Sequence, residues 1–210
     1  MRRVINNIVS FVNRFAGRVE IPEAVLDQEE TVLMHISDTP SGIYGYLYEV
    51  IDKVAPDILV HTGDLVDDIK LEHNSALLTG YRRRLPGFLS NLESRGIDTY
   101  IIPGNHDSFD VLQEVSKNSD IKKNKGDISV EGVKIGMAHY REELPEDTVV
   151  NLFGHDMQID KGHGRLYLNG MYNVNIILFP SLKTYTIPYP PGTNRERKYN
   201  NILTPGRMSL

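Results

Sequence analysis

The chain has 210 residues, contains no cysteine and carries a formal net charge of −5. With 40% apolar and 24% charged residues, this length fits one sizeable hydrophobic core better than two. The absence of cysteine excludes thiolate metal sites, disulfides and cysteine nucleophiles, and the acidic balance gives no strong nucleic-acid signature. No run of about 18 apolar residues occurs, so the sequence predicts no membrane-spanning helix.

Residues 1–30 are predicted to form an amphipathic helix followed by a solvated linker. The first 18 residues contain four arginines and no acidic residue, with apolar residues at helical spacing. We expect residues 3–16 to dock on the domain or on a protein partner, or alternatively to lie on a membrane surface. Asparagines and Arg14 interrupt any signal-peptide core, so the segment is expected to stay on a cytoplasmic protein.

From residue 31 the chain alternates between apolar runs and amphipathic segments. The apolar runs predict strands at residues 31–36, 57–61, 99–102, 133–138 and 149–153, with further strands within 165–186. Amphipathic segments at 42–54 and 78–95 predict helices that connect parallel strands. Glu131-Gly132 lies between two apolar runs and predicts a β-hairpin. The pattern indicates one α/β domain over residues 31–190, followed by an irregular basic tail at 191–210.

Polar residues that suit metal binding follow each of the five predicted strands. In chain order they are Asp38, Gly63-Asp64, Gly104-Asn105-His106-Asp107, His139 and Gly154-His155. We expect each glycine to let the backbone turn sharply, so that the next side chain points into a shared crevice. One histidine after an apolar run is usually a packed core residue, but five such strand ends together predict a metal centre. Carboxylate, amide and imidazole ligands suit Mn²⁺, Fe²⁺ or Zn²⁺.

Three other polar residues receive structural interpretations. His35 and His61 lie inside predicted strands, so we expect them to pack in the core near the site. Asp67 is expected to orient a metal ligand rather than to bind metal itself.

The motifs GDLVDD, GNHD and GHD, with the isolated His139 between the last two, resemble the calcineurin-like metallophosphoesterase superfamily. The pattern of that superfamily is D-x-H, G-D-x-x-D, G-N-H-[DE], H and G-H-x-H, and the resemblance runs from about Thr31 to Met157. It implies a four-layer αββα sandwich of two mixed β-sheets. It also implies a two-metal centre at the strand ends and a phosphate-ester substrate.

The resemblance assigns a role to each strand-end residue. It implies that Asp64 bridges two metals and that one of them takes its other ligands from Asn105, His139 and His155. The second metal would take Asp38, Asp64 and two histidines, and this sequence has Pro40 and Met157 in place of those histidines. We therefore expect one tightly bound divalent ion, Mn²⁺ first and Zn²⁺ or Fe²⁺ as alternatives, and a second ion that is weak or absent. His163, in a glycine-flanked loop, is a less favoured replacement ligand.

The resemblance also implies a role for His106, because the histidine of this motif does not bind metal but protonates the leaving oxygen or steadies the charge on phosphorus. Asp107 is expected to orient its imidazole. The sequence thus predicts a phosphoesterase that hydrolyses a phosphomonoester or phosphodiester with metal-activated water. The alternative is a weak or inactive scaffold that binds a protein partner, as a retromer subunit of the same superfamily does. The retained His106 favours catalysis.

Overall fold

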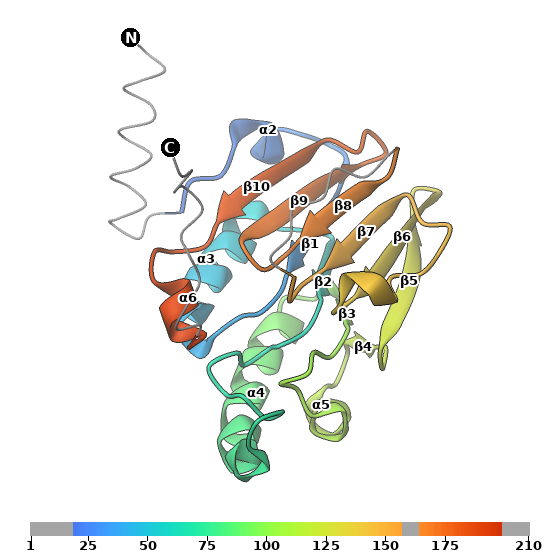
Figure 1. Cartoon of the computed structure of the whole chain (residues 1–210). Coiled ribbons are helices and arrows are strands. Elements are labelled where there is room, and N and C mark those ends of the chain that lie inside the picture. The colour runs from blue at the N-terminus through green and yellow to red at the C-terminus, as the bar shows by residue number, and fades with distance from the viewer. Residues whose placement is uncertain (1–18, 157–163, 199–210) are drawn as a thin grey trace, which may run out of the picture.

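The structure is a computed structural model and describes residues 19–156 and 164–198. The predicted amphipathic helix at residues 3–16 lies outside these ranges, as do Met157 and His163. Two β-sheets, packed face to face, dominate the described chain (Figure 1).

The larger sheet has six strands in the order β10-β9-β1-β2-β3-β4. Its four parallel strands are β1 (Thr31–Ile36), β2 (Ile58–His61), β3 (Asp98–Ile101) and β4 (Asp120–Ile121). Two antiparallel strands, β9 (Asn173–Phe179) and β10 (Thr184–Pro188), extend the sheet beyond β1. The sheet is therefore mixed, with the carboxyl ends of β1, β2 and β3 at one edge.

The smaller sheet has four strands in the order β5-β6-β7-β8. They are β5 (Lys125–Val130), β6 (Val133–Ala138), β7 (Val150–Phe153) and β8 (Leu166–Asn169). β5 and β6 form the predicted hairpin, and the φ angles of Glu131 and Gly132, 48° and 78°, have the signs of a type I′ turn. β6, β7 and β8 run parallel, so β6 and β7 also end at a common edge.

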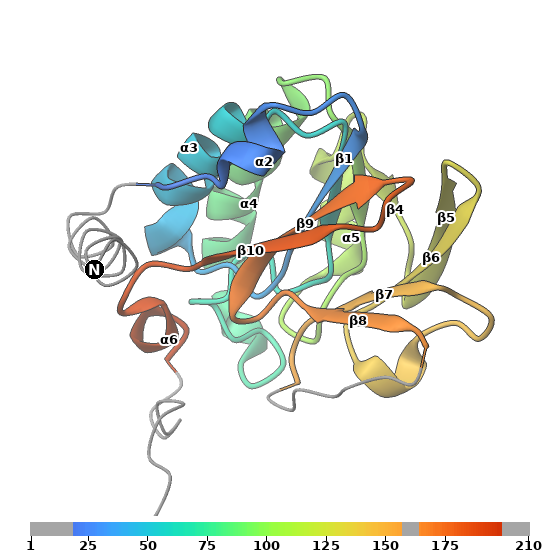
Figure 2. The ribbon, with the colours of Figure 1, turned by 90° about the horizontal axis from the view of Figure 1, so that it is seen from above.

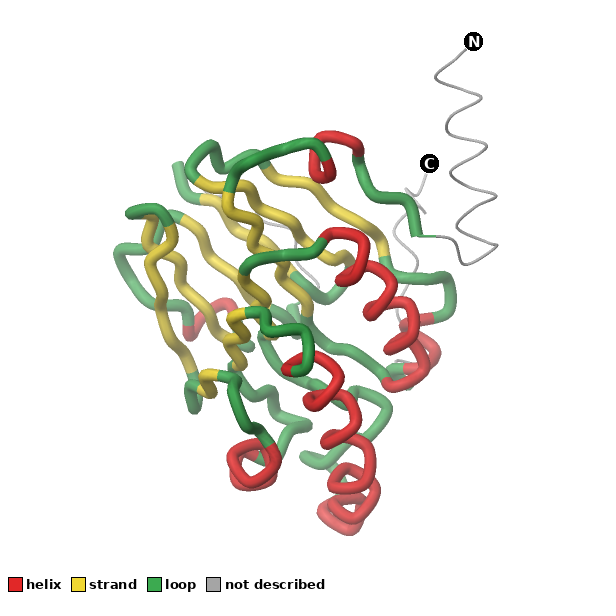
Figure 3. The backbone as a smooth tube through the Cα atoms, turned by 180° about the vertical axis from the view of Figure 1, so that it is seen from behind, coloured by secondary structure: helices red, strands yellow, loops and turns green. Residues whose placement is uncertain are grey.

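Helices cover the larger sheet on the side away from the smaller one (Figure 2). The helical elements are α2 (Glu23–Leu26), η1 (Ser41–Ile43), α3 (Tyr44–Val54), η2 (Ser75–Leu77), α4 (Leu78–Glu93), α5 (Phe109–Val115), η3 (Arg141–Glu143) and α6 (Thr193–Glu196). Figure 3 shows α3 and α4 side by side on this face, where Phe88 of α4 stacks on Tyr44 of α3. α3 buries Leu47, Val50, Ile51 and Val54, the one-sided stripe expected of a helix on a sheet.

Side chains alternate between the two faces of each strand of the larger sheet, so the hydrophobic core has two layers. In β1, Met34 and Ile36 pack against the helices, whereas Leu33 packs between the two sheets. The layer between the sheets also contains Val60 of β2 and Leu152 of β7. Alternate residues of a strand point to opposite faces, so one apolar run supplies both layers.

The predicted fold class is confirmed: the chain is an α/β sandwich of two mixed β-sheets. The predicted strands and long helices occur within two residues of their expected ends. α5 and β4 were not predicted, because their short sequences show no clear apolar period. Residues 19–30, expected to be a solvated linker, contain α2 and bury Val19 and Val25. Residues 191–198, expected to be irregular tail, contain α6 and bury the side chain of Arg197.

Candidate metal centre

The carboxyl ends of five parallel strands bring the predicted ligands together. β1, β2 and β3 lead into Asp38, Asp64 and Asn105, and β6 and β7 lead into His139 and His155. Single ligand atoms of Asp38, Asp64, His139 and His155 all lie within 4.8 Å of one another. Asn105 joins this group, because its Oδ1 atom is 3.0 Å from the Nε2 atom of His139. All five predicted ligands thus converge.

The hydrogen bonds of this group leave several acceptors facing one another. The Nδ1 atom of His139 is 2.7 Å from the carbonyl oxygen of Thr62. A carbonyl oxygen only accepts, so Nδ1 carries the proton and Nε2 presents a lone pair. That lone pair faces two further acceptors, Asn105 Oδ1 at 3.0 Å and Asp64 Oδ2 at 3.7 Å.

Three further atoms of the site are buried without a hydrogen-bond partner: Asp38 Oδ1, Asp64 Oδ2 and His155 Nδ1. Buried polar atoms normally find a partner, because removing them from water unpaired costs about 1–3 kcal/mol each. A divalent cation satisfies acceptors of this kind together. The residues present therefore fit a metal ion, and the mixture of carboxylate, amide and imidazole ligands suits Mn²⁺, Fe²⁺ or Zn²⁺.

The pKa values of the buried carboxylates also favour a bound metal ion. Burial, together with the nearby carboxylates of Asp38 and Asp107, raises the pKa of Asp64 well above its ordinary value. Burial and the charges of Asp64 and Asp38 raise the pKa of Asp67 to about 8. Buried carboxylates ionise readily only when a positive charge lies beside them, and Asp67 already has the Lys70 ammonium as its partner, whereas the Oδ2 atom of Asp64 has no hydrogen-bond partner.

Strained backbone marks three of the five candidate ligands. Asp38, Asp64 and His155 have φ angles of 52°, 57° and 50°, in the left-handed region that side chains other than glycine rarely adopt. Each costs about 1 kcal/mol or more, and residues of this kind cluster at functional sites. Strand ends that turn in this way aim their side chains back across the edge of the sheet.

The glycines before these residues serve two different purposes. Gly63 has a φ of 103° and makes the sharp turn that the sequence predicts. Gly104 and Gly154 have no positive φ, so the chain leaves these strands without the left-handed conformation that glycine allows. A Cβ atom at Gly104 would overlap the carboxylate of Asp64, and one at Gly154 would overlap the side chains of Ser37 and Asp38. These two glycines instead make room for buried carboxylates.

His106 lies at the edge of this cluster with 4% of its surface exposed. Its backbone N–H donates to Asp64 Oδ1 at 2.9 Å, which ties it to the central carboxylate. Burial, helped by the charge of Lys70, lowers the pKa of its imidazole to about 3. The free protein therefore holds this ring neutral.

Asp107 does not orient His106, contrary to the expectation from the sequence. Its carboxylate accepts hydrogen bonds from the backbone N–H groups of Asp64, Leu65 and Gly104, at 2.7, 3.0 and 2.9 Å. It also accepts one from the Tyr81 hydroxyl at 3.0 Å. Asp107 therefore joins the loops after β2 and β3, which places Asp64 beside the residues of the GNHD motif.

A family model described as calcineurin-like phosphoesterase matches residues 31–200. The chain belongs to this family. A search of curated proteins finds no match to the sequence.

Solved structures also resemble this fold. One crystal structure is similar at 14% identity and a TM-score of 0.54, over 77% of this chain and 100% of the other. A protein of unknown function from Aquifex aeolicus is similar at 16% identity and a TM-score of 0.46, over 74% of this chain and 95% of that one. Yfce, a phosphoesterase from E. coli, is similar at 15% identity and a TM-score of 0.47, over 75% and 99%. At these identities the likeness concerns the fold.

The two buried histidines inside the strands of this family member are core residues, as expected from the sequence. The Nε2 atom of His35 is 2.9 Å from the Thr62 hydroxyl, and that of His61 is 2.9 Å from the Thr39 hydroxyl. Burial lowers the pKa of both imidazoles to about 3, so both are neutral. They fix the backbone on either side of Asp38 and Asp64 without pointing to the ligand group.

Three residues at the site of this family member escaped the sequence analysis: Lys70, Glu72 and Tyr140. A fourth, Arg197, lies in the stretch that the sequence predicted to be a basic tail. The Tyr140 ring packs against the imidazoles of His139 and His155, with centroids 4.9 and 4.7 Å apart. Glu72 contacts Asn105, and Lys70 contacts Asp67. None of them belongs to a family motif. Tyr140 is next to His139 in the sequence, but the others are not adjacent to a predicted ligand. Their positions at the site are therefore seen only in the folded chain.

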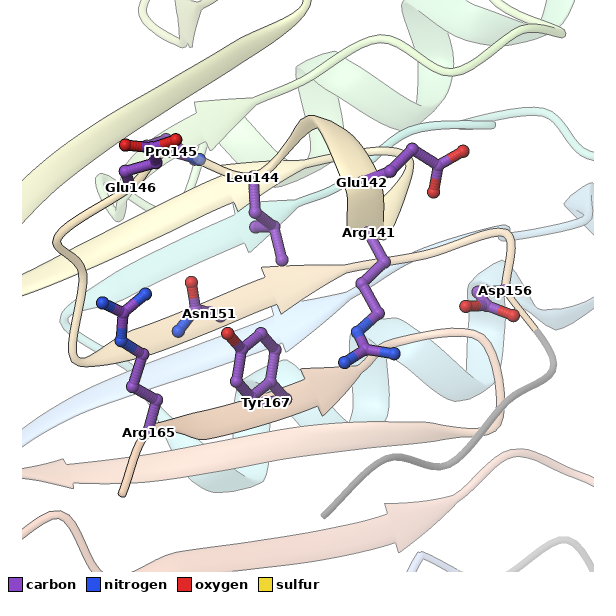
Figure 4. Close-up of a pocket in the computed structure, with 9 residues that line it drawn as sticks. All are labelled: Arg141, Glu142, Leu144, Pro145, Glu146, Asn151, Asp156, Arg165 and Tyr167. Carbon is purple, nitrogen blue, oxygen red and sulfur yellow. The ribbon is translucent and has the colours of Figure 1, made fainter. Parts of the chain in front are cut away.

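A pocket of about 380 Å³ adjoins the candidate metal centre on the outer side of the smaller sheet (Figure 4). Its lining residues are Arg141, Glu142, Leu144, Pro145, Glu146, Asn151, Asp156, Arg165 and Tyr167. Arg141 lies two residues after His139, and Asp156 directly follows His155. The Arg141 guanidinium packs over the Tyr167 ring, 5.2 Å from its centroid. The lining mixes both signs of charge.

Proposed function

We propose that the protein is a metal-dependent phosphoesterase that hydrolyses a phosphomonoester or a phosphodiester. The convergence of five candidate ligands, three of which have a buried atom without a hydrogen-bond partner, supports this proposal most directly. Family membership supports it independently. The nearly buried His106, tied to Asp64, adds a group that can carry a proton at the edge of the same cluster.

The ion would be held by Asp38, Asp64, Asn105, His139 and His155, with Mn²⁺ as the first candidate and Zn²⁺ or Fe²⁺ as alternatives. When bound, it supplies Lewis acidity toward a phosphoryl oxygen and makes a bound water more acidic. Asp38 keeps one oxygen for this role, because its Oδ2 atom already accepts from Ser37 Oγ at 2.6 Å and from the His155 backbone at 3.1 Å.

In this proposal His106 delivers a proton to the leaving oxygen. A neutral imidazole must first gain that proton, and the negative charge of a phosphate ester beside it favours the protonated form. The hydrogen bond from the His106 backbone N–H to Asp64 anchors the backbone of His106 beside the ligand group. Tyr140, packed on both histidine ligands, limits the orientations that they adopt.

One tightly held ion is expected rather than two. Pro40 is buried and begins η1, so the position offers no side-chain ligand where the family motif has histidine. Met157, the other replaced position, lies outside the described residues.

No helix among the described residues is long and apolar enough to cross a bilayer. A cytoplasmic location and a partner for residues 3–16 stay predictions from the sequence.

The test is a panel of phosphomonoesters and phosphodiesters with the full chain, stripped of metal and reloaded with Mn²⁺, Zn²⁺ or Fe²⁺. We expect hydrolysis of at least one class, and the substitution His106→Ala should lower turnover by about 10²- to 10⁴-fold with unchanged metal content. His73→Ala is the matched control, because the His73 ring is exposed and 5.2 Å from the His106 ring. Metal-loaded protein that hydrolyses no ester in the panel would overturn the proposal.

A further inference from the structure

The loop after β2 brings a lysine to the side of the metal centre where the family motif has lost a ligand. The backbone N–H of Asp67 donates to the carbonyl oxygen of Thr39 at 3.1 Å, so Asp67 lies against the turn that carries Pro40. The Lys70 ammonium binds the Asp67 carboxylate through Oδ1. The charge of Lys70 is therefore held beside the position of the replaced histidine.

A second group of potential ligands occupies this side of the centre. Single ligand atoms of Asp64, Asp67 and His106 lie within 4.8 Å of one another, and all three residues are buried. The Oδ2 atom of Asp67 has no hydrogen-bond partner. This group shares Asp64 with the first one, so the two groups are close enough to hold neighbouring positive charges.

Positive charge already lies beside Asp67, a member of this second group. The Lys70 side chain is 14% exposed, and its partner Asp67 is fully buried. The Nε atom of Arg197 lies 3.7 Å from Asp67 Oδ2 and donates to the Asp38 carbonyl at 2.6 Å. Buried carboxylates need paired charge, and these two side chains provide it without a metal ion.

We propose that the Lys70 ammonium takes the place of a second metal ion, so that the centre holds one divalent ion and one fixed positive charge. For hydrolysis, which rests on the function proposed above, Lys70 stabilises the negative charge on the phosphoryl oxygens that a second ion would otherwise contact. The metal stoichiometry follows from the geometry alone and does not depend on the reaction.

The test compares the metal binding of the full chain with that of Lys70→Met. Each protein is stripped with a chelator and titrated with Mn²⁺ by calorimetry, and electron paramagnetic resonance reports spin coupling between neighbouring ions. We expect about one ion in the wild type and about two coupled ions in Lys70→Met. Lys122→Met is the matched control, because Lys122 pairs with Asp120 at 2.8 Å away from the centre, and it should bind one ion.

A second substitution identifies the ligands of the added ion. Asp67→Asn in the Lys70→Met background removes a carboxylate from the second group, and the stoichiometry should return to about one. With Mn²⁺ low enough to fill only the first position, Lys70→Met should turn over substrate about 10²-fold more slowly.

Two binding results would overturn the proposal: two tight ions in the wild type, or a single ion in folded Lys70→Met. If Lys70→Met is insoluble, Lys70→Gln repeats the measurement, and Mn²⁺ during expression should rescue either variant. Failure of both to fold with Mn²⁺ present would also overturn the proposal, since the ion should replace the lost charge. If the wild type is inactive but Lys70→Met gains an ion, the phosphoesterase function is refuted and the role of Lys70 in metal stoichiometry stands. If the wild type is active and Lys70→Met shows unchanged binding and turnover, the role of Lys70 is refuted and the phosphoesterase function stands.

Discussion

The Glu72 carboxylate accepts a hydrogen bond from the Nδ2 atom of Asn105 at 2.6 Å. This contact turns the other end of the amide, Oδ1, toward the His139 Nε2 atom. Glu72 therefore positions a candidate metal ligand without touching the ligand group itself. Glu72→Ala should lower Mn²⁺ affinity about 10-fold, because a partner that orients a ligand typically contributes about 10- to 100-fold. Calorimetric titration of the metal-stripped protein measures the effect.

Glu114→Ala is the control for this prediction. Glu114 is similarly exposed and also makes one short hydrogen bond, to Arg82 at 2.5 Å, but it lies on α5 away from the ligands. Its substitution should leave Mn²⁺ affinity unchanged. Equal affinity in Glu72→Ala and the wild type would show that Asn105 needs no outside support.

Asp107 should contribute to stability more than to proton transfer. Each oxygen of the Asp107 carboxylate accepts two hydrogen bonds. In Asp107→Asn one of these oxygens becomes an N–H₂ group, which cannot accept, so two buried donors lose their partner. We expect a loss of about 2–4 kcal/mol in the free energy of unfolding, measured with urea. Tyr81→Phe removes only one of these hydrogen bonds and should cost about 1 kcal/mol. Full stability in Asp107→Asn would restore the idea that this residue acts mainly on His106.

Asp64 should be unfavourable for the metal-free fold. Its Oδ2 atom is buried without a hydrogen-bond partner and faces the lone pair on His139 Nε2. Asp64→Asn removes the buried charge and offers that nitrogen a donor, and asparagine tolerates the left-handed backbone at this position. We expect the metal-free variant to melt about 4 °C or more above the metal-free wild type and to gain nothing from Mn²⁺. A lower melting temperature without metal would argue that Asp64 is paired within the protein itself.

The sequence predicted the parts of the structure that depend on short-range pattern. Apolar runs located the strands of both sheets, and because parallel strands share an edge, the residues after them had to meet. For this reason Asp38 and His155, 117 positions apart in the printed sequence, could be assigned to one site before the fold was known. Family motifs then assigned roles within that group.

Contacts between distant loops could not be predicted in this way. Asp107 follows His106 directly, which suggested that the two act together, but adjacent residues on a turn point in different directions. Glu72 and Lys70 lie in a polar loop without a period, and nothing in their sequence indicates what they face. Arg197 lay in a stretch that composition assigned to the surface, yet it donates to the Asp38 carbonyl. Each of these positions depends on tertiary packing.

Glu93, the last residue of α4, organises the loop that leads from α5 to β4. Its carboxylate accepts hydrogen bonds from the backbone N–H groups of Lys117, Asn118 and Ser119, at 3.0, 3.1 and 3.1 Å. The hydroxyls of Ser116 and Ser119 donate to the same carboxylate at 2.8 and 2.9 Å. Burial alone would raise the pKa of Glu93, but these donors outweigh it and lower the pKa below the ordinary value of 4.5.

This lowered pKa predicts how stability depends on pH. A carboxyl whose pKa is lower in the folded than in the unfolded protein stabilises the fold above the unfolded pKa, near 4.5. The contribution is lost as the pH falls through the folded value. Glu93→Gln should therefore cost about 1–2 kcal/mol at pH 7, and the difference from the wild type should shrink as the pH falls below about 4.5. Urea unfolding of both proteins from pH 7 to pH 4 measures this change.

Glu49→Gln provides the comparison for Glu93. Glu49 is an exposed residue of α3 whose carboxylate pairs with Lys53 at 2.8 Å, and surface changes of this kind usually stay within about 0.5 kcal/mol. A Glu93→Gln variant with the same cost at pH 7 and pH 4 would show that the shape of the side chain matters and its charge does not. A cost confined to the higher pH establishes that the ionised carboxylate holds the 116–119 loop, because only the charged form accepts from all five donors at once.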